Sequence, residues 1–196
     1  MTLQSESAEA DRISFVKKAS RLFHDFRYDE LSVDMIHHKM SLSRDDFEEL
    51  FESKDLLFRE VLKYNVANEK DAPWLELRRN SDIKVALRMF LERCKADLMN
   101  EAVLGNLVLE TATSGSNGSF IAGSAIETAK NLVCALISER FEEAHRLGQL
   151  SGRLSTEQRV VLIYSTLRLM KIYSKTPLGE AVMSTAIDSA IAGSCS

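Results

Sequence analysis

Apolar residues recur every three to four positions along most of the chain, which is the spacing of one face of an α-helix. The pattern predicts a first helix over residues 10–26 and later helices over 82–99, 101–112, 120–147 and 157–175. A last helix is expected over residues 180–193, after a break at Pro177-Leu178-Gly179. With three shorter helices between residues 32 and 70, the chain is expected to be all-α, with about nine helices.

Three serines divide the segment that follows the first helix. Ser32, Ser43 and Ser53 each precede a group of apolar residues and can accept hydrogen bonds from the first amides of a helix. Asp46, three residues after Ser43, completes a pattern typical of a capping box. Two short helices joined by a turn of two residues form a helix-turn-helix arrangement, in which the second helix can enter the DNA major groove.

The last two predicted helices carry more apolar surface than one chain needs. In residues 157–175 the apolar positions cover more than one face, which predicts burial on two sides. A two-fold contact of four helices, made from residues 157–193 of each chain, is the natural interpretation, and a monomer ending in a helical hairpin is the alternative. The residues expected at this dimer interface are Val160, Tyr164, Leu167, Met183, Ile187, Ala190 and Ile191.

Residues Arg12–Leu57 resemble the N-terminal domain of the TetR family of transcriptional regulators. The family motif A-x-x-L-F appears as "ASRLF" at 19–23, and T-S-V-x-x-I-A appears as "LSVDMIH" at 31–37. The G-V-S turn appears as "SLS" at 41–43, and F-x-S-K-x-x-L as "FESKDLL" at 51–57. The family's Gly-Tyr turn appears as Arg27-Tyr28. The remainder of the chain also resembles the family's second domain, through weaker motifs.

This resemblance implies a helix-turn-helix domain at residues 1–58 and a helical ligand-binding and dimerisation domain at 59–196. It implies a homodimeric, ligand-responsive regulator in which a small molecule tilts the fourth helix and alters the spacing of the two N-terminal units. A cytoplasmic protein is expected, since the N-terminal residues contain no apolar run typical of a signal peptide. The wall of the ligand cavity would be mostly apolar, which suits an apolar or aromatic ligand, although each residue can equally be ordinary core. The candidates are Trp74, Phe90, Cys94, Met99, Leu104, Leu107, Glu110, Phe120, Ile137, Phe141 and Met170.

The helix expected to read DNA is unusually acidic. With Phe47, Leu50 and Phe51 facing inward, Asp45, Glu48, Glu49 and Glu52 share the opposite face. DNA is a polyanion, and cationic side chains supply much of a protein's affinity for it. The candidates for DNA contact are Ser32, Lys39, Ser43, Arg44, Asp45, Glu48, Glu49 and Lys54.

Two interpretations of this helix stay open. Residues 1–60 hold nine Lys or Arg against 14 Asp or Glu, whereas the whole chain has a net charge of −4. In the first interpretation the protein binds operator DNA, with basic residues at the flanks contacting phosphates. In the second it keeps the fold but binds no DNA, and the acidic face contacts a basic protein surface or serves only as a solvated face.

Other classes of function find little support in the sequence. No P-loop, G-x-S-x-G or H-E-x-x-H motif is present, so we assign no catalytic residue and expect no enzyme activity. The three cysteines lie far apart, which favours neither a disulfide framework nor a metal site, and Cys195 is expected to be exposed. No cofactor is expected. No membrane contact is expected either, since no apolar run approaches the length that spans a bilayer.

Overall fold

The computed structural model describes residues 3–26, 28–100, 106–114 and 123–195. These residues contain α-helices and short 3-10 helices and no strand, in agreement with the predicted all-α class. Nine α-helices in the described part of the chain have seven residues or more, and α5 adds a single turn. The elements are α1 (Leu3–Asp25), η1 (Tyr28–Glu30), α2 (Val33–Met40), α3 (Arg44–Phe51), α4 (Lys54–Asn68), η2 (Pro73–Leu75), α5 (Glu76–Arg79), α6 (Ile83–Met99), α7 (Leu107–Thr113), α8 (Gly123–Arg146), α9 (Thr156–Tyr173) and α10 (Gly179–Ser194).

The N-terminal unit is built around aromatic side chains. Phe58 of α4 lies 4.6 Å from the ring of Phe23 and 4.9 Å from the ring of Tyr28, measured between centroids. Phe47 and Phe51 fill the space between α3 and the rest of the unit, and each is only 1% exposed. This apolar cluster explains why α2 and α3 fold although each has only eight residues, because helices of that length are unstable without tertiary packing.

Helix α4 belongs to the N-terminal unit as much as to the rest of the molecule. Arg12 of α1 forms an ion pair with Glu60 of α4 and also donates to the backbone oxygen of Leu50. Further along both helices, Ser20 Oγ donates to Asn65 Oδ1 over 2.6 Å. These contacts run along α4, so α1, α3 and α4 are expected to move together.

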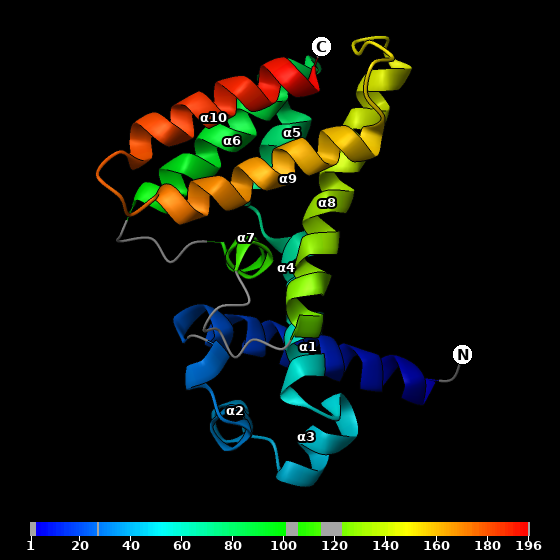
Figure 1. Cartoon of the computed structure of the whole chain (residues 1–196). Coiled ribbons are helices and arrows are strands. Elements are labelled where there is room, and N and C mark those ends of the chain that lie inside the picture. Colours follow the sequence, from blue (N-terminus) through cyan, green and yellow to red (C-terminus); the bar gives the residue numbers. More distant parts are fainter. Residues whose placement is uncertain (1–2, 27, 101–105, 115–122, 196) are drawn as a thin grey trace.

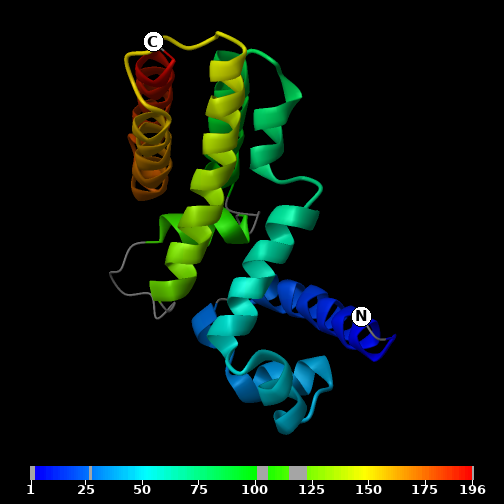
Figure 2. The ribbon, with the colours of Figure 1, turned by 90° about the vertical axis from the view of Figure 1, so that its right-hand side faces the viewer.

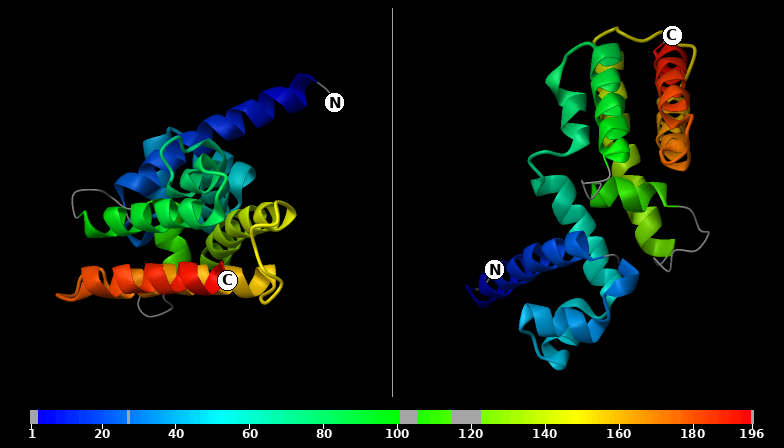
Figure 3. Two further views of the ribbon diagram at one scale, coloured as in Figure 1. Left: turned by 90° about the horizontal axis from the view of Figure 1, so that it is seen from above. Right: turned by 90° about the vertical axis from the view of Figure 1, so that its left-hand side faces the viewer.

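The second part of the chain stacks its helices above this unit (Figure 1). The long helix α8 runs upward beside α4, and α9 crosses it near its upper end. Helices α9 and α10 pack side by side and form one side of the molecule (Figure 2). Seen from above, α10 follows one edge with α6 on its inner side (Figure 3).

The observed helix boundaries differ from the predicted ones at a few places. Helix α1 begins at Leu3 and not at residue 10, because its first residues are polar helix formers that the apolar pattern cannot detect. The single-turn helices η2 and α5 are too short to show a period and were not predicted. Helix α7 begins at Leu107, where Asn106 caps it, whereas residues 101–105 of the predicted helix lie outside the described residues.

Cys195 corrects another expectation, since it is buried and only 6% exposed. The preceding residue explains the difference. The buried Arg159 donates to the backbone oxygen of Ser194 and, over 2.6 Å, to that of Ser151. One guanidinium thus fixes the end of α10 against the start of α9, and the thiol is enclosed with it.

Candidate functional site

The outer face of α3 is a row of carboxylates. Asp45, Glu48, Glu49 and Glu52 are all exposed, as the spacing predicts, and the opposite face of the helix is buried. Asp46 lies in the first turn of α3 and forms the predicted capping box, in which its backbone amide donates to Ser43 Oγ over 3.1 Å. The helix is therefore well formed, and its solvent face is negative.

Arg44 is the cation nearest to this face. Its Nε donates to Glu48 Oε1 over 3.0 Å, and this hydrogen bond is the main reason that the pKa of Arg44 is raised above its ordinary value. Both side chains are exposed, so the pair contributes little to stability. It neutralises one of the carboxylates, and the face remains acidic overall.

The other DNA-contact candidates divide into surface and internal residues. Ser32 is exposed and its Oγ accepts from the amide of Met35 as the cap of α2, while Lys39 is exposed beside the ring of Phe26. Lys54 is partly buried instead, and its Nζ donates to the backbone oxygens of Leu31 and Tyr28 over 2.8 and 3.1 Å. Burial lowers the pKa of Lys54. This lysine therefore ties α4 to the residues before α2, and its hydrogen bonds point inward.

The turn between α2 and α3 needs a left-handed residue. Ser41 has φ 58° and ψ 40°, and its amide donates to the backbone oxygen of His38. Glycine adopts this conformation without the steric cost that a Cβ atom brings. This geometry accounts for the glycine of the family motif that stands at this position.

We expect Ser41→Gly to stabilise the protein by about 0.5–1 kcal/mol, because it removes the Cβ strain of the left-handed turn. Chemical denaturation monitored by circular dichroism measures the change. Ser41→Ala is the matched control, since it keeps the Cβ atom and should give no such gain. If alanine stabilises as much as glycine, the backbone of this turn is not strained.

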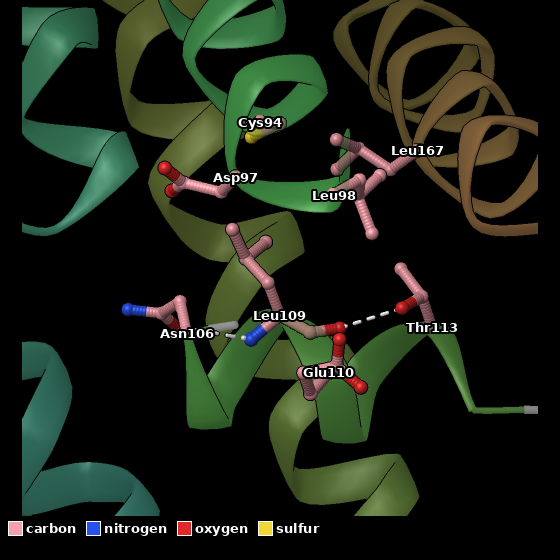
Figure 4. A pocket seen from close by; sticks show the side chains of 8 residues that line it. All are labelled: Cys94, Asp97, Leu98, Asn106, Leu109, Glu110, Thr113 and Leu167. Carbon is pink, nitrogen blue, oxygen red and sulfur yellow. Dashed lines mark hydrogen bonds between the residues drawn. The ribbon is translucent and has the colours of Figure 1, made fainter. Parts of the chain in front are cut away.

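A small cavity lies between α6 and α7, with one residue of α9 closing its side. Its volume is about 30 Å³, enough for one or two water molecules. Figure 4 shows leucine side chains from the three helices at its centre and polar groups at its rim. The lining residues are Cys94, Asp97, Leu98, Asn106, Leu109, Glu110, Thr113 and Leu167.

Among the predicted cavity residues that the structure describes, Cys94 and Glu110 line this space. Leu107 is half-buried beside it, and Met99 is exposed to solvent. Leu104 and Phe120 lie outside the described residues. The remaining candidates are buried and do not line this cavity, so their role stays a prediction: Trp74, Phe90, Ile137, Phe141 and Met170.

Several lining residues were absent from the prediction. Leu109 and Thr113 of α7 lie at helical spacing with Asn106 and the predicted Glu110, and these four residues share the face that looks toward α6. The cap at Asn106 was the available signal, since it fixes where the helix begins and so which residues share a face. Burial raises the pKa of the Cys94 thiol, which keeps it protonated.

Two polar contacts connect the cavity rim to the end of α4. Asn106 Nδ2 donates to Glu69 Oε2 over 2.8 Å, and Glu69 is the residue that follows α4. Arg93 of α6 bridges Asp71 and Asp97, with Nη2–Oδ2 and Nε–Oδ1 distances of 3.0 and 3.1 Å. Burial raises the pKa of Glu69, and the hydrogen bond from Asn106 opposes this only in part.

The raised pKa of Glu69 predicts a pH dependence of stability. Because the carboxyl is harder to ionise in the folded state, its protonated form favours folding, and stability is lost as the pH rises from the ordinary glutamate value of about 4.3 through the folded pKa. We expect Glu69→Gln, which keeps an acceptor for Asn106, to melt at a higher temperature than the wild type at neutral pH and at the same temperature near pH 4. Melting temperatures across this range test the prediction, and a constant difference at every pH would contradict it.

A second hollow runs along the outer surface of α9 and α10. This groove has a volume of about 650 Å³ and an uncharged lining. Its residues are Leu162, Ser165, Thr166, Leu169, Leu178, Ala181, Val182, Thr185, Ala186, Ser189 and Ala190.

Most of the predicted dimer-interface residues lie outside this groove. Met183 and Ile187 are fully buried within the chain, and Val160, Leu167 and Ile191 are also buried there. Tyr164 is half-buried and donates from its hydroxyl to the backbone oxygen of Ala112. Of the predicted set, Ala190 lies in the groove. The expected stripe packs the protomer's own core, and a neighbouring stripe faces outward.

Among the described residues, none of the helices is long and apolar enough to cross a membrane. No group of three or more histidine, cysteine, aspartate or glutamate side chains there is placed to hold a metal ion.

Comparison of the sequence with protein-family models and with curated proteins gives no match. Comparison with solved structures gives TetR-family regulators. A cysteine mutant of the regulator CifR, bound to a 26-base-pair operator DNA, is 18% identical with a TM-score of 0.64, and the match covers 92% of this chain and 95% of that one.

Two further structures have similar scores. A TetR-family regulator from Pectobacterium atrosepticum is 18% identical with a TM-score of 0.61 over 96% of this chain and 93% of that one. A regulator from Cytophaga hutchinsonii is 13% identical with a TM-score of 0.65 over 95% of this chain and 96% of that one. The sequences are too different to transfer residue roles, but the match runs through both parts of the molecule. This chain therefore has the fold of the TetR-family transcriptional regulators.

Proposed function

We propose that this protein is a homodimeric, ligand-responsive transcriptional regulator that binds operator DNA through its helix-turn-helix. The observation that carries the proposal is the preserved geometry of α2 and α3. Both helices are capped by serines, and they are joined by a tight left-handed turn. The same fold is bound to operator DNA in CifR. The division into residues 1–58 and 59–196 is part of this proposal.

The groove on α9 and α10 supports the homodimer. Its lining carries no charged side chain, so two copies related by a two-fold axis can meet there without bringing like charges together. Leu178 is 70% exposed and Leu162 is 39% exposed, which is costly for large apolar side chains in water. Small residues such as Ala181 and Ala186 let the helices of the partner approach closely.

The cavity between α6 and α7 supports a response to a small molecule. Leu98, Leu109 and Leu167 give it an apolar centre, and Asn106 and Glu110 place polar groups at its rim. This chemistry suits a mainly apolar ligand with one polar end. At about 30 Å³ the cavity is far smaller than such a ligand, so binding requires α6 and α7 to separate.

The acidic face of α3 shapes how this regulator would use DNA. A carboxylate can accept a hydrogen bond from the N4 amino group of cytosine, but it is repelled by phosphates. We therefore expect weak affinity for random duplex and a gain from a matched site. Lys39 of α2 and Arg44 of α3, both exposed, can contact the phosphates at the flanks.

Titration of the wild-type protein against a labelled random duplex tests the DNA part of the proposal. At about 50 mM salt we expect binding with a dissociation constant in the range of about 1–100 μM, weakening steeply as salt is added, because counterion release drives non-specific binding. Absence of binding at about 100 μM protein would contradict it.

The exposed carboxylates favour a second candidate function, in which the protein keeps the fold and dimer but contacts a basic protein surface through α3. Asp45, Glu48 and Glu49 would then pair with lysines or arginines of the partner. The two candidates differ in the same titration, since this second protein would bind no duplex even at low salt.

A further inference from the structure

Among the described residues, the lining of the cavity between α6 and α7 contains two carboxylates, Asp97 and Glu110, and no basic side chain. From this arrangement we infer that the ligand is an organic cation, with one ammonium group on an apolar body. Glu110 is the residue that pairs with the ammonium group. The inference rests on the proposed ligand-responsive function and names the class of ligand for that same cavity.

The centre of the cavity suits the apolar body of such a ligand. Leu98, Leu109 and Leu167 come from three different helices and meet there, and the polar groups lie at the rim (Figure 4). A ligand whose apolar end packs on these leucines can therefore place its polar end beside Glu110.

The uncharged polar groups of the rim already have partners within the protein. Asn106 Oδ1 accepts from the amides of Val108 and Leu109 at 3.1 Å each, and its Nδ2 donates to Glu69 Oε2 over 2.8 Å. Thr113 Oγ1 donates to the backbone oxygen of Leu109 over 2.7 Å. A ligand that bonded to either side chain would have to break contacts that order α7 itself.

Glu110 differs because a ligand can replace its partner. Lys171 Nζ of α9 donates to Glu110 Oε1, and the two side chains are 31% and 39% exposed. When a ligand ammonium takes the place of the lysine ammonium, the carboxylate stays paired and the lysine extends into water on its flexible chain. An anionic ligand would instead take Lys171 from Glu110 and leave that carboxylate without its partner.

The same exchange loosens the helix that has to move. Helix α7 is held to α9 by the pair Lys171–Glu110 and by the hydroxyl of Tyr164, which donates to the backbone oxygen of Ala112 over 2.6 Å. The cavity of about 30 Å³ must widen to admit a ligand. A cation that binds Glu110 releases one contact that opposes this widening, whereas a neutral ligand of the same shape leaves the contact in place.

The thiol of Cys94 indicates the sign of the electrostatic field at the cavity wall. Burial is the main cause of its raised pKa, and the carboxylate of Asp97 raises this pKa by more than Arg93 lowers it. Asp97 therefore dominates over its ion-pair partner Arg93 at this wall, although their Nε–Oδ1 distance is only 3.1 Å. Negative charge is disfavoured there, and the same field attracts a cation.

Three probes of equal chain length test the inference: n-octylammonium, n-octanol and n-octanoate, whose head groups are positive, neutral and negative at neutral pH. Isothermal titration calorimetry on the whole protein, without DNA, measures their affinities. We expect the ammonium to bind at least about tenfold more tightly than the alcohol, because it gains a charged hydrogen bond, and the carboxylate to bind most weakly.

Two substitutions at the ion pair should act in opposite directions. Glu110→Gln should reduce the preference for the ammonium over the alcohol to about twofold or less. Lys171→Met removes the competing lysine and should raise the affinity for the ammonium by about threefold or more. Glu139→Gln is the matched control, since Glu139 is also paired with a cation, Arg78, but does not line the cavity. It should leave all three affinities unchanged.

Equal or tighter binding of the alcohol or the carboxylate to the wild type would overturn the inference and leave the proposed ligand response standing. If none of the probes binds, both fail. Ammonium binding that Glu110→Gln does not weaken would place the probe elsewhere, for example in the apolar groove of α9 and α10, and would also overturn the inference. Loss of affinity in Lys171→Met would show that the ion pair only supports the fold. Because no DNA is present, these outcomes are independent of operator binding.

Discussion

Replacing carboxylates on the outer face of α3 by their amides is expected to strengthen binding to random duplex DNA by about 10- to 100-fold at about 50 mM salt. The variant is Asp45→Asn/Glu48→Gln/Glu49→Gln, whose three sites are all exposed, so folding should be little affected. The gain has two causes. The repulsion of phosphates is removed, and Arg44, freed from its ion pair with Glu48, becomes available to them. Fluorescence anisotropy with a labelled duplex measures the change.

A matched control separates this local effect from a change in net charge. Glu139, Glu142 and Glu143 are exposed on α8, far from the helix-turn-helix, and their replacement by glutamine changes the charge of the protein by the same amount. This control should gain several-fold less affinity than the α3 variant. Equal gains would mean that α3 does not approach the DNA.

Leu162→Glu is expected to convert the proposed dimer to a monomer, and this is the second large effect. Leu162 lies in the α9–α10 groove, so a dimer formed through this groove would bury the new carboxylate of each chain in an apolar interface. Burial of an unpaired charge should weaken association by at least about 100-fold. Light scattering after size-exclusion chromatography should report a mass near 22.0 kDa, and twice that mass for the wild type.

Val85→Glu is the control for this substitution. Val85 of α6 is 43% exposed, close to the 39% of Leu162, but does not line the groove. It should leave the dimer intact. A wild-type protein that already runs as a monomer, or a Leu162→Glu variant that stays dimeric, would show that this groove is not the interface.

The sequence allowed the fold to be predicted in considerable detail. The serine caps predicted the starts of α2, α3 and α4 at the observed residues. Capping depends on hydrogen bonds between residues close in the sequence, so the residue types are enough to recognise it. The exposed acids of α3 followed from helical spacing in the same way. The early start of α1 and the single turn α5 were missed, since neither produces an apolar period.

The candidate sites were harder to predict because they depend on how helices pack. Phe90, Phe141 and Met170 have the chemistry of a cavity wall and are buried outside the lining of the small cavity, and no sequence pattern distinguishes a wall residue from a core residue. On α10 the predicted interface stripe through Met183 and Ile187 packs inward. The helix has apolar and small residues on both faces, so its period could not show which face the protomer itself covers.

The central claim is that two helix-turn-helix units of a homodimer bind operator DNA together. Selection of wild-type binders from a pool of random duplexes, followed by sequencing, tests it most directly. We predict enrichment of an inverted repeat whose half-sites lie about 10 base pairs or a multiple of this apart, and loss of that enrichment in Leu162→Glu. A pool that shows no enriched sequence after repeated rounds would contradict the claim.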